Sequence, residues 1–190
     1  MKILRLIPDA FLFLRELLLG VVRGNGSAIA ATLRRWHYGT PCTIDTNVYI
    51  RSVRNFEAGK QSALYHACYI HNAYGKFRIG ANSHMGAFCF VNVCYGNVTI
   101  GDDVAVGPGT KIIAYSNHYE AGKKVTDLRV TRDVVIGNNV FVGADCTILP
   151  GSVVQDNVVI AAGSVVKGEL ESNSVYGGVP CRKIKSGWYE

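Results

Sequence analysis

The sequence predicts an all-β protein whose chain winds as a coil of short strands, and two observations predict this class. An aliphatic residue returns at every sixth position, most regularly in the series Ile136, Val142, Ile148, Val154, Ile160 and Val166. The same spacing occurs in two further series, at Ile79, Met85 and Val91 and at Ile100, Val106 and Ile112. Glycine is frequent, with 21 residues against 5 prolines, which indicates many tight turns rather than a low-complexity chain.

A period of six fits neither an amphipathic helix, which repeats every 3.6 residues, nor a plain strand, which repeats every two. It fits a coil of three flat strands, each of which points one aliphatic side chain inward and ends in a tight turn. Three such units make a coil of about 18 residues, and stacked coils bury a continuous aliphatic column. The chain is therefore expected to divide into a helical segment over 1–41, a β-helix over 42–171 and an extension over 172–190.

The composition limits the function classes. With 190 residues, 48% of them apolar and 18% charged, the chain suits one domain with a sizeable core rather than a large multi-domain enzyme or a disordered protein. The net charge of +6 suits a phosphate-bearing or otherwise anionic partner. The basic residues are too few and too scattered for nucleic acid, and neither an RNA-binding signature nor a recognition-helix pattern is present.

The first element, residues 1–23, is very apolar, and its polar residues recur mainly at spacings of 3, 4 or 7, which predicts an amphipathic helix. The apolar runs between charges are too short for a spanning helix, and no signal-peptide cleavage pattern follows. Two interpretations remain open: the helix packs on its own domain or its copies, or it lies on a membrane surface. A second helical stretch is expected over 28–36.

The six cysteines contain no CxxC pair, and most lie within apolar runs, where a thiol behaves as a small hydrophobic group. They are expected to be reduced and buried, which places the protein in the cytoplasm. If residues 1–23 lie on a membrane, the protein would be peripheral at its inner face.

The repeat over about residues 42–185 resembles the hexapeptide-repeat acyltransferase superfamily, which implies a left-handed parallel β-helix and a homotrimer. The handedness comes from the resemblance and not from the period. Between Ile112 and Ile136 the repeat is interrupted, and the polar excursion over 115–133 leaves the coil. Loops that leave a rigid scaffold often carry function.

His118 lies at the start of this excursion, and an exposed imidazole has a pKa suited to a general base. Taken alone, such a histidine is more often a solvated loop residue than a base. In the sugar and xenobiotic acetyltransferases of the superfamily, the catalytic histidine lies where such a loop leaves the β-helix. The resemblance therefore implies that His118 is the base in direct acyl transfer from acetyl-CoA, with no protein nucleophile.

The C-terminal extension contains Gly177-Gly178-Val179-Pro180-Cys181-Arg182, which resembles the closing segment of galactoside and maltose acetyltransferases. In that family, coenzyme A lies along the last coils between two subunits. Carried over by position, the implied cofactor contacts are Phe141, Ala144, Ala162, Lys167, Arg182 and Lys185. Basic side chains in this set suit the phosphates, while small residues let a ligand reach backbone amides; a solvated basic tail is the alternative for Arg182 and Lys185.

The acceptor side departs from the family pattern. Positions that bind sugar as Asn and Asp in galactoside-type enzymes fall here near Ala87 and Tyr95, so a simple free sugar is not the expected acceptor. The polar residues left near the expected site are Asn92, Asn117, Tyr119 and Glu120. The resemblance thus predicts O-acetylation of a sugar or glycan hydroxyl, with N-acetylation of an amino sugar as an alternative. If the apolar residues 1–23 lie on a membrane, a cell-envelope polysaccharide precursor is the favoured acceptor.

A rival hypothesis rests on His66 and His71. The zinc carbonic anhydrases built on the same β-helix carry two ligand histidines at this spacing, plus a third from elsewhere. Here the third ligand is missing from its usual upstream place, and the nearest other histidines are His37 and His84. No metal is therefore expected, and the two histidines are equally turn or interface residues. A further alternative is a structural trimer without catalytic activity.

Overall fold

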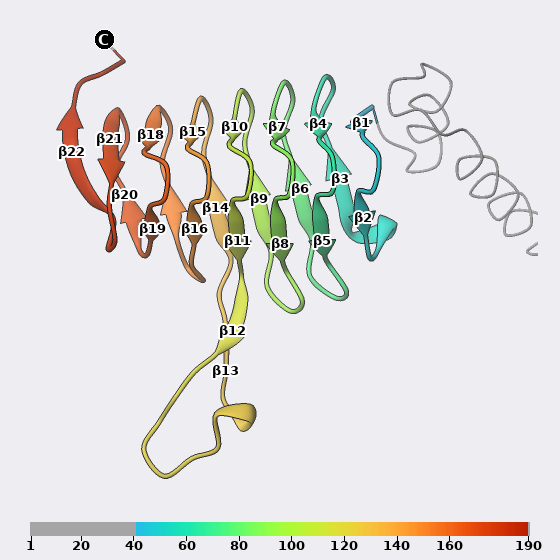
Figure 1. Ribbon diagram of the computed structural model, residues 1–190, viewed down its shortest axis with the longest axis vertical. Coiled ribbons are helices and arrows are strands. Elements are labelled where there is room, and N and C mark those ends of the chain that lie inside the picture. The colour runs from blue at the N-terminus through green and yellow to red at the C-terminus, as the bar shows by residue number, and fades with distance from the viewer. Residues whose placement is uncertain (1–40, 190) are drawn as a thin grey trace, which may run out of the picture.

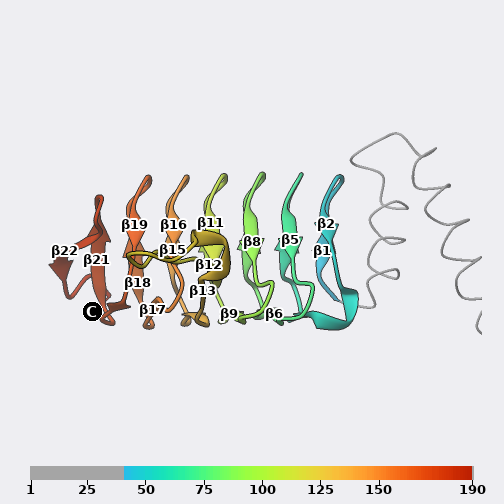
Figure 2. The same ribbon diagram turned by 90° about the horizontal axis from the view of Figure 1, so that it is seen from below.

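The computed structural model describes residues 41–189 as one elongated β-helix, with its coils stacked in a single row (Figures 1 and 2). Residues 1–40 and residue 190 lie outside the described residues. The predicted helical segment over 1–41, except its last residue, and the predicted membrane contact of residues 1–23 therefore lie outside them too.

Each coil contributes one short strand to each of three faces. Face A contains β1 (Thr43–Ile44), β4 (Ala63–Leu64), β7 (His84–Met85), β10 (Ala105–Val106), β15 (Phe141–Val142), β18 (Val158–Ile160), β21 (Ser174–Gly177) and β22 (Arg182–Ser186). Face B contains β2 (Tyr49–Ile50), β5 (Tyr69–His71), β8 (Phe90–Asn92), β11 (Lys111–Ile113), β16 (Thr147–Ile148) and β19 (Val165–Val166). Face C contains β3 (Phe56–Ala58), β6 (Phe77–Ile79), β9 (Val98–Ile100), β14 (Val134–Ile136), β17 (Val153–Val154) and β20 (Glu169–Leu170).

Neighbouring strands within each face run parallel, as a helical coil requires, and only β22 runs antiparallel, against β21. The 3-10 helix η1 (Val53–Asn55) lies between β2 and β3. Strand β21 pairs in parallel with β18, so parallel stacking continues into the segment that the sequence analysis assigned to the C-terminal extension. The strand β22 then folds back on β21 and covers this end of face A (Figure 1).

The core is the aliphatic column that the six-residue period predicts. In the most regular series, from Ile136 to Val166, each of the six side chains is at most 1% exposed. The two shorter series are buried to the same degree. Aliphatic side chains of successive coils lie directly in register, as in the pairs Ile112 with Ile148 and Ile100 with Ile136. Burial of each such side chain stabilises the fold by about 1.5–3 kcal/mol.

A buried polar ladder follows the turn from face A to face B, called turn AB, for example residues 143–146. There Cys68, Cys89 and Cys146 donate through Sγ to the carbonyls of Gly86, Gly107 and Ala161 in the next coil, at 3.1–3.3 Å. Thr110 takes the same place in its coil and donates to the carbonyl of Gly143. The thiols therefore donate hydrogen bonds to backbone carbonyl groups that the aliphatic side chains of the column cannot satisfy.

The expectation of reduced, buried cysteines fits the structure closely. Cys68, Cys89, Cys94, Cys146 and Cys181 are free thiols, and all of these except Cys94 are buried. Burial raises the pKa of the Cys146 and Cys181 thiols.

Cys94 is therefore expected to react first with iodoacetamide at neutral pH, because it is only partly buried, whereas the reagent cannot easily reach the buried thiols of Cys68, Cys89, Cys146 and Cys181. Peptide mass spectrometry over a time course measures the order of labelling. A Cys94→Ser variant serves as the control and should lack the fast phase. Rapid labelling of Cys146 in the folded protein contradicts the prediction.

The excursion leaves the coil at the turn from face B to face C, called turn BC. Turn BC consists of residues 72–76 in one coil, residues 93–97 in the next and residues 114–133 in the third. Contacts between coils consequently span 21 residues early in the coil, 36 across the excursion and 18 after it. The 18-residue coil predicted from the period is thus confirmed directly after the excursion, lengthened before it, and shortened to 16 residues in the last coil, where Val158 pairs with Ser174.

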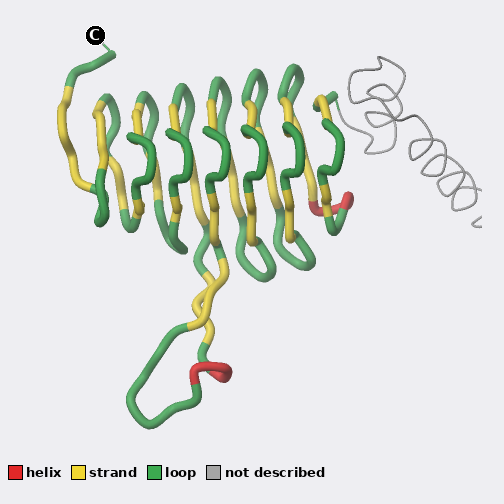
Figure 3. Tube along the Cα trace, in the orientation of Figure 1, coloured by secondary structure: helices red, strands yellow, loops and turns green. Residues whose placement is uncertain are grey.

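The excursion is more ordered than a polar loop. Its two ends pair as an antiparallel hairpin of β12 (Tyr115–Asn117) and β13 (Arg129–Thr131), and η2 (Val125–Asp127) lies near its tip. Figure 3 shows the hairpin projecting from the row of coils. The strands β11 and β14 hold its two roots on adjacent faces, and Arg132 N donates to the carbonyl of Ala114 at 3.1 Å. Roots fixed this close together favour pairing of the segments that follow them.

Candidate active site

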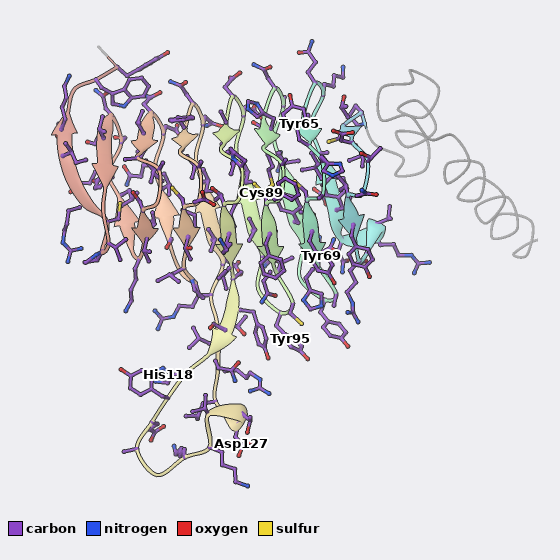
Figure 4. All side chains as sticks on the ribbon, in the orientation of Figure 1. Tyr65, Tyr69, Cys89, Tyr95, His118 and Asp127 are labelled. Atoms are coloured by element: carbon purple, nitrogen blue, oxygen red, sulfur yellow. The ribbon has the colours of Figure 1, made fainter. Side chains whose placement is uncertain are left out.

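His118 follows directly after β12, and its backbone N donates to the carbonyl of Leu128 across the hairpin at 3.2 Å. Figure 4 shows the side chain on the projecting hairpin, outside the row of coils. The ring lies 5.5 Å from the ring of Tyr119, measured between centroids, and is otherwise exposed. None of the hydrogen bonds among residues 41–189 involves its imidazole nitrogens, so both can exchange a proton with a ligand.

A cleft of about 400 Å³ lies at the root of the hairpin, beside His118. One wall comes from the hairpin and the other from turn BC of the two following coils. Its lining residues are Ser116, Asn117, His118, Val130, Arg132, Leu149, Pro150 and Lys167. The geometry thus combines an unpartnered imidazole with a recess large enough for part of a small-molecule ligand.

The predicted acceptor residues are placed differently from one another. Asn117 lines the cleft, and its Nδ2 also donates to the carbonyl of Val125 at 3.0 Å. Asn92 lies at the end of β8, beside the root of the hairpin. Its Nδ2 donates to the carbonyl of Tyr115, and its Oδ1 accepts from Cys94 N. Tyr119 is 81% exposed, and Glu120 pairs with Lys123 at 2.8 Å. The structure brings only Asn117 of these four into the cleft.

The predicted cofactor residues fall into three groups. Phe141 is exposed on β15 of face A, while Arg182 and Lys185 are exposed on β22 at the end of that face. Ala144 and Ala162 lie at turn AB. Lys167 lies at turn BC and lines the His118 cleft. Within one chain, face B separates turn AB from the cleft, so these residues do not form one site in a single subunit.

Turn AB offers open backbone donors at Ala144 and Ala162. At the turn from face C to face A, side chains of the next coil accept the corresponding amides: Asp102 Oδ1 from Ala81 N, and Asp156 Oδ1 from Asn138 N. At turn AB an alanine stands in that place, and within residues 41–189 the amides of Ala144 and Ala162 have no acceptor. Turn AB of the last coils can therefore hydrogen-bond a ligand that carries amide carbonyls.

The coils at turn AB also pack very closely. A Cβ added at Gly143 would lie 2.4 Å from Ala162 N, which is closer than real side-chain contacts allow. Glycine is therefore needed at this position, and the small residue after it keeps the backbone accessible.

Five residues of the cleft were not predicted from the sequence: Ser116, Val130, Arg132, Leu149 and Pro150. The coil length after the excursion was the available signal. Thr147 pairs with Val165, so the residues that follow those strands, Leu149 and Lys167, lie at the same turn. Arg132 had no such signal, because its position depends on how the hairpin root meets β14.

The zinc hypothesis finds no ligand set in the described part of the chain. His66 Nδ1 lies 2.9 Å from Thr46 Oγ1, and His71 Nε2 lies 3.2 Å from Arg51 Nη1. No group of three or more His, Cys, Asp or Glu side chains gathers among residues 41–189. The two histidines instead belong to the side-chain contacts of the first coils.

No helix between residues 41 and 189 is both long enough and apolar enough to traverse a bilayer.

Comparison with known proteins adds three kinds of similarity. Residues 133–168 match the bacterial transferase hexapeptide family (six repeats). The chain is 36% identical over 86 residues to a galactoside O-acetyltransferase of Escherichia coli strain K12, which covers 44% of this chain and 41% of that protein. It is 46% identical over 52 residues to WbbJ of the same strain, a protein named for O-acetyl transfer in lipopolysaccharide biosynthesis, over 27% of this chain and 26% of WbbJ. The chain thus spans less than half the length of these curated relatives.

Solved structures resemble the whole described coil. The Bacillus cereus N-acyltransferase AntD, determined with a dTDP-linked amino sugar and coenzyme A, superposes with a TM-score of 0.70 at 23% identity, over 77% of this chain and 81% of AntD. A maltose O-acetyltransferase of Clostridium difficile 630 superposes with a TM-score of 0.60 at 23% identity, over 93% and 84% of the two chains. The predicted fold class, a left-handed parallel β-helix of hexapeptide repeats, is confirmed for the described residues.

Proposed function

We propose that this chain is an acetyl-CoA-dependent O-acetyltransferase whose acceptor is a sugar or glycan hydroxyl. The match of residues 133–168 to the bacterial transferase hexapeptide family supports this proposal, and the shared β-helix fold is consistent with it. The observation that carries the proposal is His118, an imidazole with unbonded ring nitrogens at a cleft of about 400 Å³ on this scaffold. The curated relatives named above support acetyl transfer as the reaction class.

In the proposed reaction, His118 removes the proton from the acceptor hydroxyl as that oxygen attacks the thioester carbonyl. Acetyl-CoA supplies the activated acyl group. The carbon–oxygen bond of the new ester forms, the carbon–sulfur bond breaks, and the proton held by His118 passes to the departing sulfur. No cysteine or serine nucleophile is required, because the acceptor is the nucleophile. A backbone N–H group is expected to stabilise the oxyanion.

Two places on the chain suit the acyl donor. The open amides of Ala144 and Ala162 suit the carbonyl groups of the pantetheine arm, and the basic residues Arg182 and Lys185 at the end of face A suit the phosphates. Phe141, exposed beside these coils on face A, offers a ring for stacking against the donor.

The separation of turn AB from the His118 cleft supports a site shared between subunits. His118 of one chain would meet a donor bound along turn AB of a neighbour, which a closed homotrimer provides. A heterologous three-fold contact repeats this pairing at each of the three interfaces. The site is then complete only in the assembly.

The acceptor is proposed to be a precursor of a cell-envelope polysaccharide. The similarity to WbbJ supports this class, and so does the absence from positions 87 and 95 of the Asn and Asp expected for simple galactosides. An amino sugar acetylated on nitrogen is the alternative outcome.

The test measures thiol release from acetyl-CoA by the full-length protein with a panel of sugars, sugar phosphates, nucleotide-linked sugars, amino sugars and polysaccharides. Acceptor-dependent thiol release, with an ester found in the product by mass spectrometry, is the expected result. An amide product would reassign the reaction to N-acetylation. Coenzyme A binding without turnover on any acceptor would indicate a structural protein instead.

A further inference from the structure

The cleft beside His118 contains two cationic side chains, Arg132 and Lys167. Both residues are exposed, and neither takes part in an ion pair among residues 41–189. No carboxylate from residues 41–189 lines the cleft. Two unpaired positive charges that face one recess create a positive potential there, which attracts an anionic group.

The acidic residues nearest in sequence are engaged elsewhere. Asp133 follows Arg132 directly, but its carboxylate accepts from Asn97 N at 2.8 Å and from Asn97 Nδ2 at 3.1 Å, in turn BC of the preceding coil. Asp127 Oδ1 accepts from Thr126 Oγ1 at 3.4 Å on η2, Glu169 accepts a hydrogen bond from Gln155 Nε2, and Glu171 pairs with Lys183. The two cations of the cleft are thus left for a ligand.

Arg132 is held at the edge of the cleft by its surroundings. Its backbone N donates to the carbonyl of Ala114, and its side-chain stem lies over Gly151, where an added Cβ would come within 3.0 Å of Arg132 Cδ. Gly151 also has a φ of +81°, which glycine adopts without strain. A guanidinium supported in this way presents its fork of N–H donors with less loss of conformational freedom.

The rest of the lining defines the other parts of the ligand. Val130, Leu149 and Pro150 supply an apolar wall, while Ser116 and Asn117 supply hydrogen-bonding groups. This combination suits a ring with an apolar face and several hydroxyls, attached to an anionic group. Phosphate and carboxylate both match the fork geometry of arginine.

We propose that Arg132 and Lys167 bind a phosphate or carboxylate carried by the acceptor, so that the enzyme selects an anionic sugar and places its hydroxyl at His118. For Lys167, which lines the His118 cleft and not turn AB, this replaces the cofactor contact that the family resemblance implies. This inference rests on the proposed function. The phosphates of acetyl-CoA are the other source of such a group, but the pantetheine arm separates them from the thioester at which His118 acts. An anion bound in the same small cleft as the base therefore belongs to the molecule that loses the proton.

The experiment has a binding arm and a turnover arm, and both use the full-length protein. The probes are inorganic phosphate, glucose 1-phosphate and glucuronate, each compared with glucose. The variants are Arg132→Gln and Lys167→Gln, with Arg78→Gln as the matched control, because Arg78 is an exposed arginine on β6 of face C that does not line the cleft. Calorimetry measures each probe without coenzyme A, and coenzyme A is measured separately. Thiol release gives kcat/KM for each sugar.

The anionic probes are expected to bind more tightly than glucose to the wild-type protein. Arg132→Gln should weaken their binding by about 10- to 100-fold, the usual effect of losing a charge-assisted hydrogen bond. The affinity of Arg132→Gln for coenzyme A should equal that of the wild-type protein. The Arg78→Gln variant should bind the anionic probes as tightly as the wild-type protein does. In the turnover arm, Arg132→Gln should raise the KM of an anionic acceptor far more than that of a neutral one.

Two results would overturn the proposal. One is equal binding of the anionic probes and glucose. The other is a loss of coenzyme A affinity in Arg132→Gln with sugar phosphate binding retained, which would assign the subsite to the donor. The absence of thiol release with every acceptor contradicts the proposed function and not the anion subsite, because the calorimetric dependence on Arg132 is measured without turnover.

Discussion

Replacing His118 with alanine is expected to lower kcat/KM for acetyl transfer by about 10²–10⁴-fold, the usual contribution of a general base. The loss follows because no other imidazole or carboxylate lines the cleft within the described residues. The substitution removes an exposed side chain whose ring makes no hydrogen bond there, so the urea midpoint should stay at its wild-type value. Binding of coenzyme A should also be retained.

The matched control is His66→Ala, which removes a histidine from the first coils. His66 contacts Thr46 and lies edge-on to Phe88, away from the cleft. Its loss should leave acetyl transfer unchanged under the proposed mechanism. A His118→Ala variant with a near-wild-type rate contradicts the assignment. Loss of activity in His66→Ala together with inhibition by a chelator would revive the zinc hypothesis.

Mixed assemblies extend the same test to the shared site. Ala162→Trp should block the open amide at turn AB, and His118→Ala removes the base, so each variant alone should be inactive. Co-assembly of the two should restore about a quarter of the wild-type activity if chains mix at random in a trimer, since one site in four then combines two intact halves. No recovery in mixed trimers would place the base and the donor in one chain.

Replacing Ile136 with alanine is expected to lower the free energy of unfolding by about 2–5 kcal/mol. Ile136 is 1% exposed and lies in the column between Ile100 and Val154, with both of which it pairs in register. The coils on either side are joined by parallel strand pairing and cannot easily close the cavity, so the lost contacts are not recovered.

The matched control for Ile136 is Val135→Ala, on the same strand. Val135 is 40% exposed because its side chain points away from the column, so its truncation should change stability by no more than about 0.5 kcal/mol. Urea denaturation of both variants at one protein concentration, monitored by circular dichroism, gives the comparison. Equal destabilisation by the two substitutions would show that the column does not dominate the stability of this coil.

The period of the aliphatic residues predicted the fold because every coil must fill the same narrow interior with one inward-pointing side chain from each face. Ile136 and Val142 each fill the same triangular section, so one position in six must be aliphatic whatever the neighbouring residues are. The family resemblance then supplied the handedness, which a period cannot contain. The six-residue period alone does not give the length of the early coils. Contacts between these coils span 21 residues rather than 18, so turn BC adds three residues to each, within 72–76 and 93–97, and the aliphatic column is not disturbed.

The site was only partly predictable, since it depends on contacts between coils. His118 and Asn117 were found from their position at the start of the excursion. Leu149 and Pro150 reach the cleft only because their coil stacks beneath the hairpin. Arg132 depends on the pairing of β12 with β13, and the polar sequence of the excursion did not indicate that pairing. Asn92 was selected for its polarity, but its amide is used to fasten the hairpin root.

The enlargement of one turn in three consecutive coils has a consequence for how this scaffold could diversify. The strands on both sides of turn BC keep their pairing whether five residues or twenty separate them, as residues 93–97 and 114–133 show. Length variation at this point is therefore nearly decoupled from the stability of the solenoid. A foreign hairpin grafted between Ile113 and Val134 should therefore change the surface around His118 and leave turn AB, where the donor is proposed to bind, unchanged.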